Sequence, residues 1–346
     1  FGNNFALTGP LPKNNASKMK TYLLVFLISA SVAGRTQAEE FNAKQVPVGV
    51  HWFFHLDVGG FKKTQLGQFA LKQAKEFGPE LDLLAKQLQF DFRKDLDSAT
   101  LFGQGDDEKQ WAILLQGKFK KTPLLAALKW KVGFKRLREA GHEILTWRDG
   151  KEDEQETHFG AIVNEGLIAL GSSKQRLVQA LNVLKGKAPV LQPKQLGGLK
   201  LEKGNYFLAA VVNVKDLPIP PEAQAFNVQS IGFRLGEQGN NITAQLLLNS
   251  VDADSSLKIQ QMLQGLLAMV QLQIAADDDP ESKELAAGLQ NLKIARQKNV
   301  VQVDLTFPVA KLLEQLNVNV QKREGDQPGK VELKFGIQGG EKKQDR

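Results

Sequence analysis

Two segments of the chain share one order of apolar and polar positions. Residues 98–128 pass from a β-rich run through a polar turn to a second β-rich run, and then to apolar positions at helical spacing. Residues 228–263 repeat this order with Gly239, Asn240 and Asn241 at the turn. Alternation around a tight turn predicts a β-hairpin, and a change to a period of about 3.6 predicts a helix. Each segment is therefore predicted to be a hairpin followed by a helix.

Further strands and helices are predicted on either side of these two segments. A strand at 48–58 ends at Gly59-Gly60, and a helix that Ser172 or Ser173 can cap runs over 174–184. The other elements follow from the same two periodicities: helices at 65–77 and 79–88, strands at 142–148, 157–163, 167–170 and 205–212, a long helix to 275, a hairpin at 289–307, a helix at 308–316 and an edge strand at 331–337.

This order predicts an α+β fold of two tandem modules, each an antiparallel sheet with helices packed on one face. The first module spans residues 39–187 and the second 204–320, with a charged tail at 321–346. Residues 188–203 form the predicted linker, because prolines and a glycine pair mark chain breaks. If the modules are structural copies, Leu125 and Leu263 should both be buried on equivalent helices.

The N-terminal 38 residues have the pattern of an upstream segment and a secretory signal. Lys20 is followed by an apolar run at 21–33 and then by small residues, as in signal peptides. A membrane anchor is the alternative, but a spanning helix needs about 20 apolar residues. We therefore expect an exported chain, periplasmic or extracellular after cleavage, with no transmembrane segment in the mature protein.

Charge and cysteine content narrow the classes of function. The net charge is +7, and residues 1–38 carry four of the 45 basic residues and no acid. The remaining 41 basic and 38 acidic residues are interpreted as interspersed, so a nucleic-acid partner is set aside. The absence of cysteine excludes disulfides, thiol nucleophiles and Cys-ligated metals. No catalytic residue, cofactor or metal is predicted.

His51, His55 and Asp57 alternate on the predicted strand at 48–58 and therefore share one face. Residues four apart on a strand are about 13 Å apart, too far for His51 and His55 to share a metal without a bulge. His55 and Asp57 could share one only with a further ligand from elsewhere. The alternative, which we prefer, is that both histidines are polar partners of neighbouring strands. His55 and Asp57 remain weak interaction candidates.

Trp147 and Arg148 lie near the tip of a predicted hairpin. Tryptophan and arginine are frequent in the energetic centres of interfaces, so this pair could anchor a partner. Alternatively, Trp147 could fill the gap between sheet and helix. The acidic clusters at 106–108, 152–154 and 277–279 lack the spacing of a calcium loop and are interpreted as solvated turns.

The duplicated layout, the leader and the strand around Trp52 resemble uncharacterised exported bacterial proteins built from duplicated α+β modules. The resemblance implies export and a tandem fold, and it brings no catalytic residues. We expect a non-catalytic exported protein that binds an envelope partner or another protein. An alternative is a periplasmic carrier that holds an apolar ligand, such as a lipid, beneath the long helix before residue 275. A hydrolase is a more distant alternative.

Overall fold

The computed structural model describes residues 41–73, 78–105, 110–149, 156–201, 206–214, 226–275 and 288–324. The predicted signal segment before residue 39, the edge strand at 331–337 and the tail beyond 324 lie outside the described residues.

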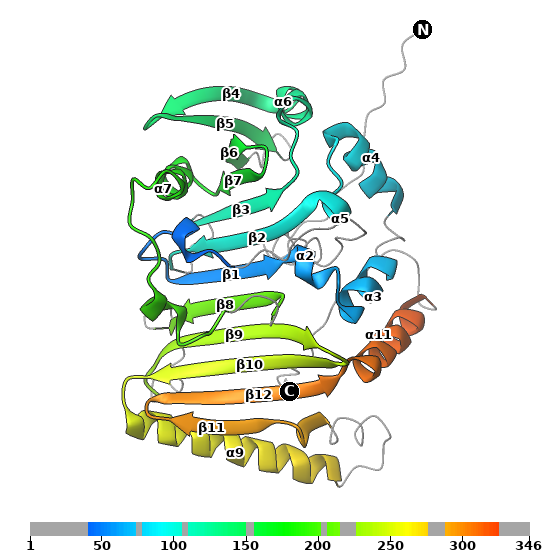
Figure 1. The fold of residues 1–346 in the computed structure, drawn as a ribbon, viewed down its shortest axis with the longest axis vertical. Coiled ribbons are helices and arrows are strands. Elements are labelled where there is room, and N and C mark those ends of the chain that lie inside the picture. The colour runs from blue at the N-terminus through cyan, green and yellow to red at the C-terminus, as the bar shows by residue number, and fades with distance from the viewer. Residues whose placement is uncertain are drawn as a thin grey trace, which may run out of the picture.

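The described strands form one antiparallel sheet of 12 strands, in the order β11-β12-β10-β9-β8-β1-β2-β3-β7-β6-β5-β4 (Figure 1). The α+β class is confirmed. The strands of the first half are β1 (Trp52–Asp57), β2 (Leu96–Gly103), β3 (Trp111–Gly117), β4 (Val132–Glu139), β5 (His142–Asp149), β6 (Glu156–Asn164) and β7 (Leu167–Gly171). Those of the second half are β8 (Leu208–Asn213), β9 (Val228–Gln238), β10 (Asn241–Ser250), β11 (Lys293–Gln297) and β12 (Val300–Pro308).

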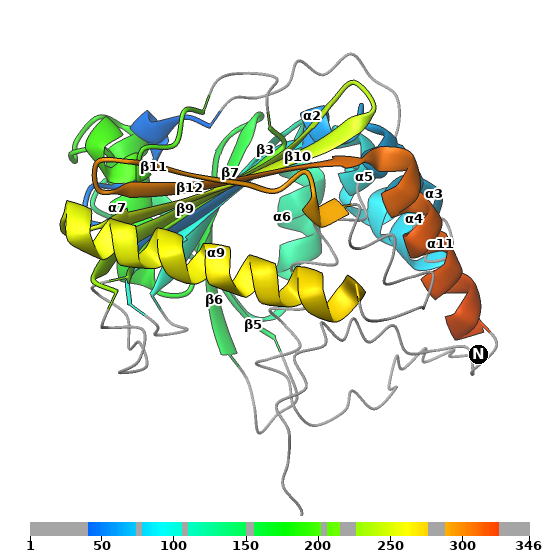
Figure 2. The same ribbon diagram turned by 90° about the horizontal axis from the view of Figure 1, so that it is seen from below.

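Helices lie on both faces and at the two ends of this sheet (Figures 1 and 2). Figure 2 shows α6 and α9 on the same side of the sheet. The helical segments are η1 (Ala43–Gln45), α2 (Val58–Phe61), α3 (Gln65–Gln73), α4 (Gly78–Leu88), α5 (Phe92–Asp95), α6 (Lys121–Lys129), α7 (Lys174–Leu184), η4 (Pro193–Leu196), α9 (Ala253–Ala275) and α11 (Val309–Glu324). None of the described helices is long and apolar enough to cross a membrane.

The two halves of the chain meet where β1 pairs with β8. The pairing is antiparallel, with Phe53 opposite Val211 and His55 opposite Ala209. The separate sheets expected for two modules are therefore joined into one sheet. Each half nevertheless keeps the predicted order of a single strand followed by a hairpin, β1-β2-β3 and β8-β9-β10.

Each face of the sheet has its own apolar core, because successive side chains of a strand point to opposite faces. On the α7 face, Phe53 packs in a cluster with Leu177 and residues of the second half such as Val211. On the opposite face, Leu56 packs in a cluster with Phe90. Both clusters join the two halves, because the second also contains Phe207.

The described part of the predicted linker at 188–203, which is residues 188–201, belongs to that first cluster. Leu191 and Leu199 are buried in it, and Pro47 forms an isolated β-bridge with Val190. The described part of this segment is therefore packed in one cluster with residues of both halves, such as Phe53 and Val211.

The strand β4 is the one described strand that the sequence pattern did not predict. It is joined to β5 by a two-residue turn in which Ala140 and Gly141 have φ of 48° and 79°. Two positive φ values are typical of the tight turns whose twist matches that of a hairpin. In sheet order β4 is the last strand, so its outer edge pairs with no described strand.

Candidate binding surface

The polar residues of β1 have structural partners. His55 is 1% exposed; its Nδ1 lies 2.8 Å from Thr100 Oγ1, and its ring meets Phe41 edge-on. Asp57 caps α2 by accepting a hydrogen bond from the backbone N–H of Gly60 at 2.7 Å. Within the described chain, no group of three or more His, Asp or Glu side chains is placed to hold a metal. His55 and Asp57 therefore have structural hydrogen bonds, and the described residues around them form no set of metal ligands.

Trp147 and Arg148 lie on β5 and contact neighbouring strands. The indole of Trp147 stacks on His158 of β6 with 5.7 Å between ring centroids, and it covers Gly160, where a Cβ would come within 3.2 Å of the ring. Arg148 lies against Gly133 of β4. Trp147 is half-buried, so it fills space between strands, whereas Arg148 is exposed.

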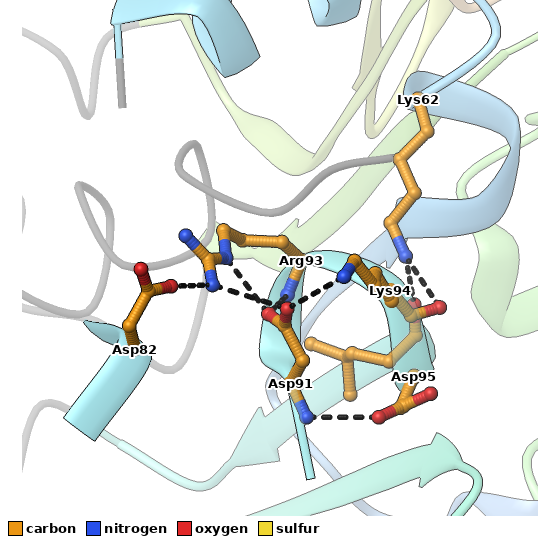
Figure 3. Close-up of polar contacts among 7 residues, drawn as sticks. Lys62, Asp82, Asp91, Arg93, Lys94 and Asp95 are labelled. Atoms are coloured by element: carbon orange, nitrogen blue, oxygen red, sulfur yellow. Dashed lines mark hydrogen bonds and ion pairs between the residues drawn. The ribbon is translucent and has the colours of Figure 1, made fainter. Parts of the chain in front are cut away.

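Lys62 is the most buried lysine of the described chain, at 7% exposure. Its Nζ donates to the backbone carbonyls of Leu96 at 2.7 Å and Lys94 at 3.3 Å, at the end of α5 (Figure 3). Burial lowers the pKa of Lys62, against the opposing effect of Asp97, Asp95 and Asp91. A lysine that satisfies the last carbonyls of a helix has a structural role.

The carboxylates near Lys62 differ in their hydrogen-bond partners and therefore in the direction of their pKa shifts. Burial raises the pKa of Asp91, but hydrogen bonds and charge from Arg93 outweigh burial and leave that pKa lowered. Arg93 donates from Nε to Asp91 at 2.8 Å and also pairs with Asp82 (Figure 3). Burial raises the pKa of Asp97, and its Oδ1 finds no hydrogen-bond partner in the described part of the chain. Lys62 and Arg93 are held by backbone carbonyls and by carboxylates of the same cluster, so we interpret it as structural.

A hollow of about 410 Å³ lies against α7. The Arg176 guanidinium at its side is held by three glutamine side-chain oxygens, from Gln110 at 2.6 Å, Gln179 at 2.7 Å and Gln104. Burial lowers the pKa of Arg176. Because these amide oxygens already orient the guanidinium, the arrangement joins α7 to the hairpin β2-β3.

The most unusual surface is formed by residues 118–138, which include α6, the following turn and β4. This segment, named the basic end below, contains eight Lys and Arg residues and no acid. All eight side chains are exposed. Trp130 ends α6 and is 91% exposed, and Val132 and Leu137 of β4 are exposed as well. An exposed tryptophan among unbroken positive charge is not required by the core.

The register of β4 places basic side chains on both of its faces. Arg138 lies opposite Glu143 and Arg136 opposite Leu145, and opposite residues share a face. That face is the α6 side, because Lys121 of α6 pairs with Glu143 at 3.7 Å. Lys135 and Leu137 therefore lie on the α7 side. The positive charge therefore lies on both faces of the edge strand.

Few described acids neutralise the basic end. Arg136 pairs with Glu143, and its hydrogen bond is the main reason that the pKa of Glu143 is lowered. No ion pair joins Lys129, Lys135 or Arg138 to a described acid, whereas Lys121 and Arg136 share Glu143. Three lysines at 118, 120 and 121 also surround the start of α6, where no side chain caps the helix. Positive charge at a helix N-terminus is unfavourable, so local stability does not explain these lysines.

The expectation that basic and acidic residues are interspersed is wrong for this segment. The signal was present in the sequence, since no Asp or Glu occurs between Glu108 and Glu139. The strand within it was missed because most of β4 is exposed, which removes the alternation of buried and exposed positions by which strands are recognised.

A second exposed apolar surface lies on α9. Ile259 and Ile274 are buried toward the sheet, whereas Leu263 is half-buried and Met262, Leu266, Met269 and Leu272 are exposed. Leu125 on α6 is also half-buried. The expectation that Leu125 and Leu263 are both buried is therefore wrong. The helix turns much of its apolar surface outward.

Comparisons with known proteins give only distant similarity. No protein-family model matches the sequence, and no curated protein matches it. Among solved structures, crystal forms III, I and IV of TP0453, a Treponema protein, resemble this chain at 11% identity. The TM-scores are 0.44, 0.43 and 0.45, with 81–82% of this chain and 97–100% of those chains covered. These values are too low to assign a shared fold or a shared function.

Proposed function

We propose that this chain is an exported, non-catalytic protein that acts by binding a component of the cell envelope through the basic end. The observation that carries the proposal is Trp130, which is 91% exposed within a segment of eight basic residues and no acid. Large exposed aromatic side chains and clustered charge mark interaction surfaces, because folding alone gains nothing from either.

The buried polar groups support a non-catalytic role. His55 has Thr100 as its partner, Asp57 caps a helix and Lys62 binds backbone carbonyls. Groups that act in proton transfer must reach a substrate in a pocket. These three side chains are instead committed to joining strands and helices.

A carrier for an apolar ligand is less well supported. That alternative places the apolar side chains of α9 around a ligand between helix and sheet. Met262, Leu266 and Met269 are instead exposed to the outside. We therefore prefer a protein that binds through its surface.

Fractionation of the host cell tests the proposal. The full chain should sediment with envelope membranes at low salt and be released at high salt, because screening weakens exposed charge interactions. A variant with Lys129→Glu, Lys135→Glu and Arg138→Glu should remain in the soluble fraction. The matched control, Lys187→Glu, Lys194→Glu and Lys200→Glu, reverses three exposed lysines elsewhere and should sediment like the wild type.

Two results would contradict the proposal. One is a wild-type chain that stays soluble at low salt after export. The other is equal loss of the basic-end variant and its control from the membrane fraction, since the net charge of the chain would then govern sedimentation.

A further inference from the structure

We infer that the basic end is a docking site for the surface of an anionic lipid bilayer, with Trp130 at the depth of the headgroups. This inference deepens the proposed function and rests on it, because it names the chemistry of the envelope component. The same residues that define the basic end carry the argument.

Charge complementarity selects an anionic partner. Eight exposed basic side chains lie within residues 118–138, and the described ion pairs of Lys121 and Arg136 share a single acid, Glu143. Basic clusters of four to eight residues are attracted to negatively charged membrane surfaces. The eight charges of the basic end fall in that range.

The apolar residues identify the anionic partner as a lipid surface. Trp130 lies between Lys129 and Lys131 and is followed by the exposed Val132. Indole rings prefer the boundary between water and hydrocarbon, and lysine stems lie along apolar material while their ammonium groups stay in water. This alternation of lysine with apolar side chains suits a headgroup layer.

The distribution of charge favours a broad surface over a single strand or groove ligand. Arg138 lies on the α6 side of β4 and Lys135 on the α7 side, while Lys118 and Lys120 precede α6. A narrow ligand could contact only one of these faces. A bilayer surface can contact the end of the molecule from all of them.

Protection of an edge strand and self-association explain fewer of the features of the basic end than lipid binding does. Edge strands often carry Lys or Arg to prevent pairing with other chains, which explains Lys135, Arg136 and Arg138. Edge protection does not explain the exposed Trp130 or the lysines before α6. Pairing of β4 with β4 of a second copy would bring Arg136 and Arg138 close to the same residues of that copy, and like charges directly opposite are destabilising.

Vesicle binding tests the inference with purified components. Vesicles of neutral phosphatidylcholine are compared with vesicles containing about one third phosphatidylglycerol, a content that gives the surface its negative potential. The full chain should bind the anionic vesicles several times more tightly, with affinity that falls as salt rises. All variants share the same N-terminus, so differences among them report the basic end.

Charge variants measure the contribution of the lysines. Lys129→Gln, Lys135→Gln and Arg138→Gln together should weaken binding about a hundredfold, from the contribution of each basic residue near an anionic surface. The control Lys187→Gln, Lys194→Gln and Lys200→Gln should bind like the wild type. Equal binding by the two variants overturns the inference.

Trp130 supplies a second, spectroscopic readout. Its emission should shift to shorter wavelength on anionic vesicles, and Trp130→Phe should abolish most of the shift that the four tryptophans produce together. Trp130 is exposed, so the variant should unfold at the temperature of the wild type. Tight vesicle binding without a shift from Trp130 overturns its placement among the headgroups.

The vesicle and cell experiments can fail separately. Sedimentation with the host envelope but no binding to anionic vesicles overturns the lipid inference and leaves an acidic envelope polymer or protein as the partner. Failure of both experiments overturns the proposed function as well.

Discussion

Asp91 and Arg93 form the best supported ion pair among the described residues of the first half. The two side chains are mostly buried, with Nε of Arg93 2.8 Å from Asp91 Oδ1. Asp91 also accepts a hydrogen bond from the backbone N–H of Arg93 and so caps α5. One carboxylate thus fixes both the start of α5 and the chain that leads into β2.

Replacement of Arg93 should make stability depend less on pH. Because the pKa of Asp91 is lowered in the folded state, its contribution is present above the unfolded value near 4 and is lost as pH falls through the folded value. Arg93→Met should therefore lower the free energy of unfolding by about 1–2 kcal/mol at pH 7, and less below pH 4. Urea unfolding at several pH values measures the difference.

A matched control separates this pair from surface charge. Lys174→Met removes the exposed pair of Lys174 with Glu139 and should change stability by less than about 0.5 kcal/mol. A loss for Arg93→Met that persists undiminished at acid pH would contradict the role given to Asp91.

Asp97 should respond in the opposite direction. Burial raises its pKa, so the cost of ionising it is present at neutral pH and disappears as pH falls toward the unfolded value. Asp97→Asn should therefore raise the free energy of unfolding by up to about 1 kcal/mol at pH 7, the lower end of the cost of an unsatisfied buried polar group. A destabilised variant at pH 7 would show that attraction to Lys62 outweighs burial.

At the scale of elements, the helix α9 has two unequal faces. Ile259 is 1% exposed and packs toward the sheet, whereas Leu263 one turn later is only half-buried. Residues of similar hydrophobicity on this helix therefore contribute unequally to the stability of the fold. The helical period predicted the helix itself, but its residues are apolar on more than one stripe, which does not reveal the buried one.

Alanine variants of α9 should separate these faces. Ile259→Ala should lower the free energy of unfolding by about 2–4 kcal/mol, as for a buried aliphatic side chain. Leu263→Ala should cost about 1 kcal/mol because less area leaves water there, and the exposed Met262→Ala should cost less than about 0.5 kcal/mol. Similar losses at all three positions would contradict the observed orientation of the helix.

Some elements follow from local sequence and others do not. The helix α7 has the predicted bounds because Ser173 accepts from the backbone N–H of Arg176 at its start and Gly186 takes a positive φ after its end. Both signals are local in sequence. The basic end was not predicted for two reasons. Its strand is mostly exposed, and basic and acidic residues were counted over the whole chain after residue 38, which hides a local excess of positive charge.

At the scale of the whole molecule, one sheet replaces two. The pairing of β1 with β8 joins residues more than 150 positions apart, such as Phe53 and Val211, and no local pattern reports such a contact. The hairpins follow from local turns, whereas the order in which hairpins join depends on which edges meet. The sequence therefore predicted the parts of the sheet better than its junction.

The junction changes what we expect when the chain is cut in the 188–203 segment. A fragment of residues 39–198 would expose the edge of β1, and a fragment of 199–346 would expose β8. The cluster that holds Phe53 and Leu177 would also lose Val211, Tyr206 and Leu247. Unpaired edges and an opened core both favour aggregation or unfolding.

Each fragment alone should therefore show poor amide dispersion in NMR, and a mixture of the two should regain the spectrum of the intact chain. Because Phe53 lies opposite Val211 at the junction, Val211→Asp in the second fragment should prevent this recovery by placing an unpaired charge in the core. The exposed Val251→Asp in the same fragment is the control and should permit it. Two well-dispersed spectra from the separate fragments would instead establish independent modules that share a sheet only by contact.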